Sequence, residues 1–275
     1  MFYRNLIFFL FFSIFLSCSD DLYVEPALKI PTINIEINNF EEINSKDDYV
    51  KGTFEFNSRD YDFEDFVQPI KIRGRGNSTW DMPKKSYQFK LEEKHNLFNF
   101  PEDKKWLMLA NYSDKTMLRN ALAFELGYLS KLDWTPNYHF AEVVINGKAK
   151  GLYQFTEKVE TGDYNRVQIG DEGFLLEVDQ LSRIDFDDIS FWTEKKLLFV
   201  VKDPDLESGS SELEKIKSYV IQTENVLYSD EFDDPNTGYS KYIDVDSFVD
   251  WYLINEISKN NDAIFFSSVY MNYVS

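Results

Sequence analysis

A short basic segment alternates arginine with glycine, Arg73-Gly74-Arg75-Gly76, and Asn77-Ser78-Thr79-Trp80 follows it. Arginine binds phosphate or carboxylate oxygens through paired N–H donors, and glycine lets backbone N–H groups come close to an anion. Lys85 and Lys90 follow on a segment that alternates apolar and polar residues, as a β-strand does. The segment therefore predicts an anion site between two strands. The ordinary alternatives are a tight turn for the glycines and a solvated strand face for the cations.

Composition limits what such a site can bind. The 275 residues are 43% hydrophobic and 17% aromatic, which is enough to build a folded core. The 48 acidic residues outnumber the 29 basic ones and give a formal net charge of -19. Nonspecific binding to nucleic acid is excluded by this charge, because such binding depends on neutralising phosphates with cations. The basic segment is therefore expected to serve a local purpose.

The N-terminus predicts a lipoprotein. Arg4 precedes an apolar stretch over residues 6–16, and Leu16-Ser17-Cys18 stands where a signal peptide is cleaved. The stretch is shorter than the ~20 residues that a membrane-spanning helix needs, and Cys18 is the only cysteine. We expect a signal peptide over 1–17, lipid attachment at Cys18 and a tether over 18–31; the alternative is an uncleaved anchor helix. These features predict a lipid-anchored protein of the cell envelope, in the outer membrane, with surface exposure left open.

Hydrophobic periodicity predicts strands first and helices later. Alternating or continuous apolar runs indicate strands at 32–37, 50–56, 67–73, 106–110, 140–145, 151–156, 173–179 and 196–202. Asn146-Gly147 between two of these runs is typical of a hairpin turn. Helical spacing begins near Lys115 and returns at 212–227 and 245–257. We therefore expect a β-rich part over about 32–180 and a mainly helical part over about 181–275.

Several ordered motifs carry a family resemblance. They are residues 72–80, Pro83-Lys84-Lys85-Ser86-Tyr87, the segments 109–114 and 118–120, Gly151 to Glu157, and Asn255 to Asp262. Together they resemble the CotH kinase family, over roughly residues 30–275. The resemblance implies an α+β, atypical protein-kinase-like fold of two lobes, with a β-rich N-terminal lobe and an incomplete, mainly helical C-terminal lobe. It also implies transfer of the γ-phosphoryl group of ATP, with Mg²⁺, to Ser or Thr of cell-envelope proteins.

The resemblance assigns roles to residues. Arg73, Arg75, Asn77 and Ser78 would cover the phosphates, and Lys85 or Lys90 would be the phosphate-binding lysine. The carboxylate that holds the lysine would be Glu157 by motif or Glu125 by position on the helix. Arg119 would reach phosphate or pair with Asp114. Phe174 or Leu176 would touch adenine or belong to a buried core.

The catalytic acid would be Asp262, which lies in a polar turn between an apolar helix and an apolar strand. A turn-capping aspartate is its ordinary alternative. Ser267 would stand in for the metal-binding asparagine of kinases, although a hydroxyl is a weaker ligand. The family's later Trp-Asp motif, which binds magnesium, does not occur before Ser275. We therefore expect either a fragment of a longer product or an inactive protein.

A second class of function remains open. The chain could be a surface interaction module or adhesin that binds a protein or another surface ligand without catalysis. Its two histidines, His95 and His139, are isolated and have no cysteine partners, so they give no zinc pattern. Phosphate transfer to an acceptor protein would favour the kinase, and ligand binding without nucleotide affinity would favour the module.

Overall fold

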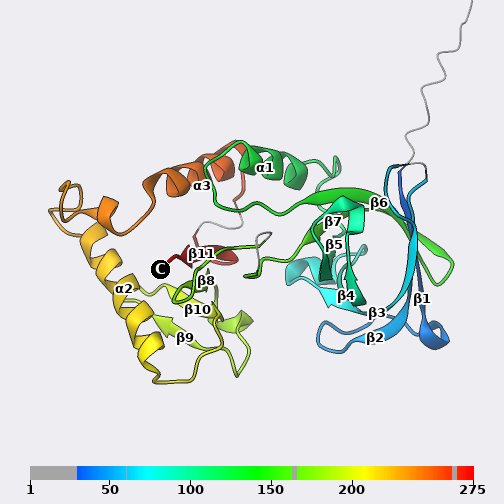
Figure 1. Ribbon diagram of the computed structural model, residues 1–275, viewed down its shortest axis with the longest axis horizontal. Helices are drawn as coiled ribbons and strands as arrows, with labels where there is room; N and C mark the ends of the chain where they lie inside the picture. The colour runs from blue at the N-terminus through cyan, green and yellow to red at the C-terminus, as the bar shows by residue number, and fades with distance from the viewer. Residues whose placement is uncertain (1–29, 60, 163–165, 262–264) are drawn as a thin grey trace, which may run out of the picture.

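The computed structural model describes residues 30–59, 61–162, 166–261 and 265–275 (Figure 1). Seven strands form a closed barrel in the order β1-β2-β3-β4-β5-β7-β6. Neighbouring strands are antiparallel except β1 and β6, which run parallel and close the barrel, with Ile33 opposite Val143. The strands are β1 (Thr32–Ile37), β2 (Val50–Asn57), β3 (Phe66–Arg75), β4 (Ser86–His95), β5 (Asp103–Leu109), β6 (Tyr138–Ile145) and β7 (Lys148–Glu157).

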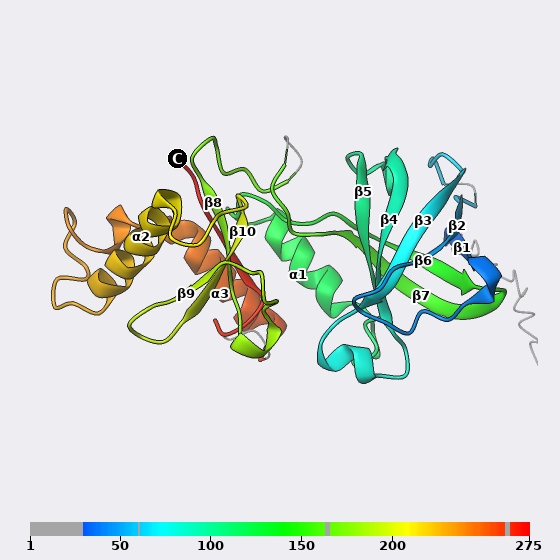
Figure 2. The same ribbon diagram turned by 90° about the horizontal axis from the view of Figure 1, so that it is seen from below.

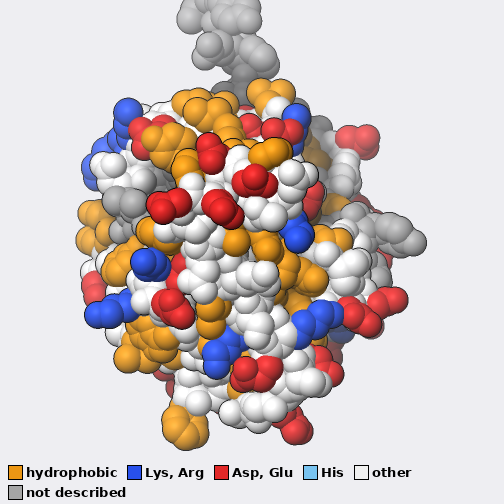
Figure 3. All heavy atoms as spheres, turned by 90° about the vertical axis from the view of Figure 1, so that its left-hand side faces the viewer, with side chains coloured by type: hydrophobic (Ala, Val, Ile, Leu, Met, Phe, Trp, Pro, Cys, Tyr) orange, Lys and Arg blue, Asp and Glu red, His pale blue; other side chains and the backbone are white. Residues whose placement is uncertain are grey.

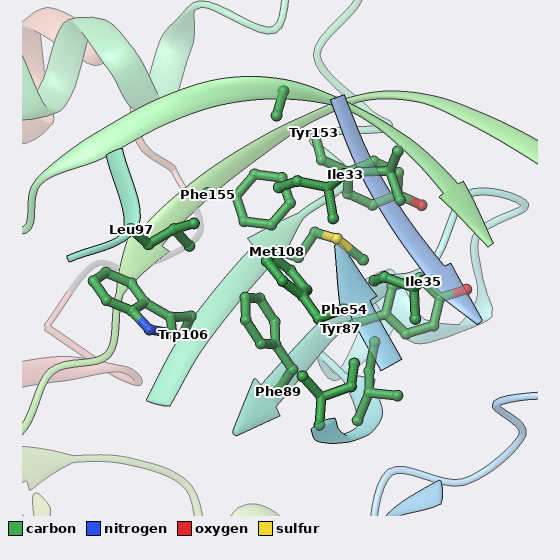
Figure 4. Packing of buried hydrophobic residues seen from close by; sticks show 14 of the residues in the cluster. Ile33, Ile35, Phe54, Tyr87, Phe89, Leu97, Trp106, Met108, Tyr153 and Phe155 are labelled. Atoms are coloured by element: carbon green, nitrogen blue, oxygen red, sulfur yellow. The ribbon is translucent and has the colours of Figure 1, made fainter. Parts of the chain in front are cut away.

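Large apolar side chains fill the barrel interior. They come from alternate positions of each strand, and rings from facing strands point toward one another (Figure 4). Phe54 stacks on Phe89 with ring centroids 5.1 Å apart, and Phe89 meets the edge of Phe155 at 6.1 Å. Trp106 and Phe155 are fully buried. Each such side chain contributes about 1.5–3 kcal/mol through burial, so the barrel is a packed core.

A second, four-stranded antiparallel sheet follows in the order β11-β8-β10-β9. Its strands are β8 (Phe174–Val178), β9 (Ser190–Trp192), β10 (Leu198–Asp203) and β11 (Val269–Tyr273). Leu176 and Phe199 lie on the face that forms a second core with Leu213 and Ile216 of α2 (Ser211–Leu227). The alternate residues of these strands therefore project from the opposite face.

Two further helices lie along one side of the molecule in Figure 1, and Figure 2 shows the same arrangement seen from below. They are α1 (Arg119–Tyr128) and α3 (Val245–Ser258), which contact each other. The backbone N–H of Lys131 donates to the Asp250 carboxylate of α3 at 2.7 Å, which ties the end of α1 to α3. Among the described residues, five short 3-10 helices complete the elements, at Asn38–Phe40, Ser78–Asp81, Leu97–Asn99, Leu181–Arg183 and Tyr239–Lys241.

The prediction of an α+β, protein-kinase-like fold with a mainly helical C-terminal lobe is wrong. The described chain is mostly β, with a closed seven-stranded barrel and three α-helices. Within 181–275, three strands pair with β8 or with one another, so this part is built around a sheet. Neither the parallel closure of β1 on β6 nor the pairing of β11 with β8 follows from local periodicity, because each joins segments far apart in the chain.

The predicted hairpin turn is confirmed. The Asn146-Gly147 turn joins β6 to β7, and both residues have positive φ values of 51° and 73°, as a tight hairpin turn requires. The predicted signal peptide and Cys18 lie outside the described residues and remain predictions, as does the division near residue 180. Over the ranges that the structure describes, the longest apolar helices fall short of what crossing a membrane would take.

Candidate functional site

The glycines of the basic segment are required by the packing of Trp80. β3 ends at Arg75, and the chain turns back through Ser78–Asp81 so that the Trp80 ring lies against Gly74. A Cβ at Gly74 would lie 2.3 Å from that ring. Gly76 has a φ of 111°, in the region that favours glycine, and a Cβ there would meet the Thr79 hydroxyl. The glycine pattern therefore has a structural cause, and the anion site rests on the arginines.

The donors of Arg73 are already occupied on the outer face of the barrel. Its Nη1 donates to the backbone carbonyl of Asp47 at 3.1 Å, and its guanidinium lies 4.8 Å from the Tyr49 ring centre. With the Gln88 amide turned so that its oxygen faces Arg73, that oxygen accepts from Nε at 2.6 Å and from Nη2 at 2.8 Å. Arg73 therefore holds the loop before β2 onto the barrel and has little donor capacity left.

Arg75 differs from Arg73, although both project from the same side of β3. Its electrostatic partners lie on the second sheet, Glu177 on β8 and Tyr270 on β11. Burial lowers the pKa of Arg75, and those two groups oppose the change. No carboxylate of the described residues lies within ion-pairing distance of its guanidinium. The guanidinium also donates no hydrogen bond to any described residue. Arg75 is thus a partly buried cation without a close counter-ion, between the barrel and the second sheet.

The second sheet presents a mixed charged group to Arg75. Glu177 and Tyr270 are opposite each other in the β8–β11 register, and the Tyr270 hydroxyl donates to the Glu177 carboxylate. Lys202 on β10 lies 3.7 Å from Glu177 and 3.9 Å from Asp188. Burial raises the pKa of Glu177, while Lys202 and Tyr270 oppose the shift. The interface therefore combines two cations with an acid whose charged form is disfavoured.

Ser267 lies beside a cation. It is 5% exposed, and its hydroxyl accepts a hydrogen bond from Nη1 of Arg183, which also lies 3.7 Å from Asp179. A cation beside this hydroxyl makes it a poor position for a second cation. Within the described ranges, no group of three His, Cys, Asp or Glu side chains could hold a metal ion. Asp262, the predicted catalytic acid, lies outside the described residues.

The lysines of the motif are used locally or point to solvent. Nζ of Lys85 donates to the Trp80 carbonyl and lies 4.9 Å from the centre of the Trp80 ring. Nζ of Lys84 donates to the Leu152 carbonyl, and burial lowers the pKa of Lys84. Lys90 is exposed on the outside of the barrel, and Asn77 and Ser78 are exposed as well. Lys85 therefore closes the Trp80 loop.

The structure does not bring the candidate carboxylates to these lysines. Glu157 is buried, and its Oε2 accepts from the backbone N–H of Asn137 at 2.8 Å. Its Oε1 lies 2.7 Å from Nη1 of Arg166, which also binds Asp103 at 2.6 Å through Nη2. Burial raises the pKa of Glu157, although Asn137 and Arg166 act in the opposite direction. Glu157 thus belongs to an internal ion-pair network at the barrel.

The α1 candidates are also engaged locally. Glu125 is exposed and accepts a hydrogen bond from the Tyr138 hydroxyl at 2.9 Å. The backbone N–H of Arg119 donates to the Asp114 carboxylate at 2.8 Å, and Thr116 binds the same carboxylate. Asp114 therefore caps the start of α1, while the Arg119 side chain is exposed. Neither Glu125 nor Arg119 is linked to Arg75 by a contact in the structure.

Sequence reasoning missed Glu177, Lys202 and Tyr270. Glu177 carried a usable signal, because a charged residue within the apolar run 174–178 must project toward a partner or a site. Phe174 and Leu176, considered as adenine contacts, lie in the core that packs against α2. The electrostatic partners of Arg75 come from β8 and β11, whose pairing brings together residues about ninety positions apart.

Comparison with known protein families finds a match. The family described as CotH kinase protein matches residues 72–274, which is well over half of the chain. The chain therefore belongs to the CotH kinase protein family. The matched region begins in β3 and ends after β11, so it includes Arg75, Glu177, Lys202 and Tyr270. A search of curated proteins finds no match.

Proposed function

We propose that this CotH family member binds the phosphates of ATP between its barrel and its second sheet. The proposed reaction is transfer of the γ-phosphoryl group to a Ser or Thr hydroxyl of a cell-envelope protein. Arg75 is the observation that supports this proposal most directly. A cation removed from water costs free energy when no counter-ion is close, as holds for Arg75 among the described residues, and a phosphate oxygen would supply charge and hydrogen bonds there.

Three groups around Arg75, on the second sheet, are compatible with a bound anion. Lys202 lies next to Glu177 and would add positive charge near the phosphates. Glu177 would repel a phosphate if it stayed ionised, but burial already raises its pKa, so a bound anion would favour its neutral form further. Tyr270 donates to Glu177 and holds that carboxyl group in place. The ligand would therefore replace solvent beside Arg75.

The chemical step needs a group that accepts the hydroxyl proton, and we assign it to Asp262 from its place in the sequence. Magnesium belongs to the proposal through the family alone. The described residues contain no suitable ligand set, and Ser267 is held by Arg183, so no step is assigned to the metal. We also propose a lipid anchor at Cys18 and a place in the cell envelope, with acceptor proteins at the same membrane.

Nucleotide binding tests the first half of the proposal. Titration of the full chain with ATP or ADP, by calorimetry, is expected to show binding that Arg75→Gln weakens about 10- to 100-fold, the range for a charged hydrogen-bonded contact. Arg59→Gln is a matched control, because Arg59 is exposed in a loop and loses the same charge. Equal affinity of the wild type and Arg75→Gln would refute a phosphate site at Arg75.

Phosphoryl transfer tests the second half. Radiolabelled phosphate from γ-labelled ATP should reach an envelope acceptor protein, and Asp262→Asn should abolish transfer without abolishing nucleotide binding. Binding without transfer in the wild type would leave a nucleotide-binding protein and refute the kinase activity of this chain.

The alternative is a surface interaction module without catalysis, and one observation favours it. Large apolar side chains are exposed on α1 and α3, and clusters of such side chains are typical of binding surfaces. They are Leu122 on α1, Leu129 directly after it, and Tyr252 and Ile257 on α3. Figure 3 views the molecule from the side where α2 lies in Figure 1, and on that face too apolar side chains are interspersed with charged ones. Retained binding of a protein ligand without affinity for nucleotide would support this alternative.

A further inference from the structure

Four lysines form one row across the outside of the barrel. The strand register places Lys51 opposite Lys71, Lys71 opposite Lys90, and Lys90 opposite Lys105. Their neighbours in sequence, such as Ile70, Ile72 and Phe89, point into the barrel core, so all four lysines project outward. The row therefore crosses β2, β3, β4 and β5, strands that are adjacent in the barrel (Figure 1).

Barrel stability does not explain this row. Like charges directly opposite each other on neighbouring strands are destabilising. Lys51, Lys71 and Lys90 are exposed and have no ion pair among the described residues, whereas Lys105 lies 3.0 Å from Glu160. The chain has a net charge of -19, yet all four positions of this row are lysine and none is acidic. The concentration of positive charge is therefore a feature that a binding partner would explain.

The residues on either side of the row favour a single extended chain over a broad surface as the binding partner. Arg73 lies two residues after Lys71 on β3, at the next outward position, and its guanidinium adds charge on the same side. On the opposite side of the row, the next outward positions of β3 are Pro69 and Val67, and Val67 is 63% exposed. The next outward position of β4 after Lys90 is Glu92. A broad anionic surface such as a bilayer would meet Glu92 and Glu55 together with the lysines. A single extended chain laid along the row would not.

We propose that this lysine row is a docking site for an extended acidic segment of a partner protein. Adjacent strands are about 4.8 Å apart, so the four lysines extend over roughly 15 Å, and flexible side chains can reach acids at alternate positions of an extended peptide. Arg75 lies four residues from Lys71 on the same outer side of β3, about 13 Å away along the strand. If the proposed kinase function is correct, the partner is the acceptor protein, and acidic residues flank its target hydroxyl.

The test is binding of a fluorescein-labelled decapeptide of alternating Glu and Ser to the full chain, measured by fluorescence anisotropy at low and at moderate salt. The double variant Lys71→Gln/Lys90→Gln is expected to bind about tenfold more weakly and with less salt dependence. The matched control is Lys148→Gln/Lys150→Gln, which removes the same charge from exposed positions of β7 and should bind as the wild type does. A urea unfolding curve of each variant would show that it is folded.

Three results would overturn the proposal: no peptide binding by the wild type, equal weakening in the control, or row-dependent binding to phosphatidylglycerol vesicles without peptide binding. The last result would identify a lipid surface as the partner. The assay contains no nucleotide, so it is independent of whether Arg75 binds ATP. A failure of peptide docking can therefore be distinguished from a failure of the proposed phosphate site.

Discussion

Replacing Arg75 by methionine is expected to stabilise the unliganded protein while removing its phosphate site. Methionine keeps an unbranched apolar stem of similar length, so the packing of the arginine stem is largely retained. What disappears is a cation that burial disfavours, as the lowered pKa of Arg75 indicates, and that has no carboxylate within ion-pairing distance among the described residues. A residue kept for ligand binding at the expense of stability should behave in this way.

The size of the effect follows from partial burial. Moving an ion wholly into a protein interior costs several kcal/mol even after relaxation. Arg75 retains some contact with solvent, and the fields of Tyr270 and Glu177 offset part of the cost, so we expect a gain of about 1 kcal/mol. For a chain of this size, 1 kcal/mol raises Tm by roughly 2–4 °C. Arg75→Lys keeps the charge and should show no such gain.

Urea denaturation and thermal unfolding of the wild type, Arg75→Met and Arg75→Lys, with and without ATP, provide the measurement. At the same ATP concentration, the Tm of the wild type should rise more than that of Arg75→Met, because only ligand binding to the folded state shifts the equilibrium. A loss of 1 kcal/mol or more in unliganded Arg75→Met would refute the reasoning. It would mean that Arg75 is satisfied in the folded protein, and the strongest support for a phosphate site would be lost.

Gly74→Ala is expected to lower the free energy of unfolding by about 1–3 kcal/mol, because its Cβ would press on the Trp80 ring; an unchanged urea midpoint would contradict this. Asp103→Asn should cost about 1–3 kcal/mol at pH 7. Burial opposes ionisation of Asp103, but the Lys105 backbone and the Arg166 guanidinium hold its pKa below the usual 3.8. This stabilisation is present above pH 3.8 and is lost as pH falls through the lowered pKa, so equal losses at pH 7 and at pH 2.5 would rule out the ion pair as the cause. Burial also lowers the pKa of His139. The resulting stabilisation is present above pH 6.5 and is lost on acidification, so His139→Phe should flatten urea midpoints between pH 8 and pH 5.

Local periodicity predicted most strands but not their assembly. The runs at 32–37, 140–145 and 196–202 fall on β1, β6 and β10, because alternating burial leaves a signal within a few residues. Barrel closure depends on the parallel pairing of β1 with β6, and the second sheet depends on β11 returning to β8. These contacts join distant segments and leave no local pattern, so the helical signals that fall on α2 and α3 do not reveal the sheet that lies beside them.

The candidate site was predicted in part for a similar reason. Arg75 was named from its motif, and the structure places it at the interface of the barrel and the second sheet. Glu157 stood out as a motif acid, yet it binds Arg166, a residue with no motif around it. The partner side of the site, Glu177 and Tyr270, depends on the register of β8 with β11. A single sequence contains no direct record of that register.

The residues of the Arg-Gly-Arg-Gly segment have different roles in the structure. Gly74 admits the Trp80 ring, Gly76 provides the turn, and Arg73 fastens the preceding loop through Asp47 and Gln88. Each of these residues is explained by the fold, because its contacts are complete within the chain. Arg75 has no such contacts with the residues that the structure describes, although the residues before it are fixed by Trp80 and by the bond from the Gly74 N–H to the Ser45 carbonyl at 2.8 Å. A backbone fixed by these contacts, with a guanidinium that no described residue pairs with and that faces a second sheet, is the arrangement that preorganised anion binding requires, since the ligand then spends little free energy on ordering its receptor.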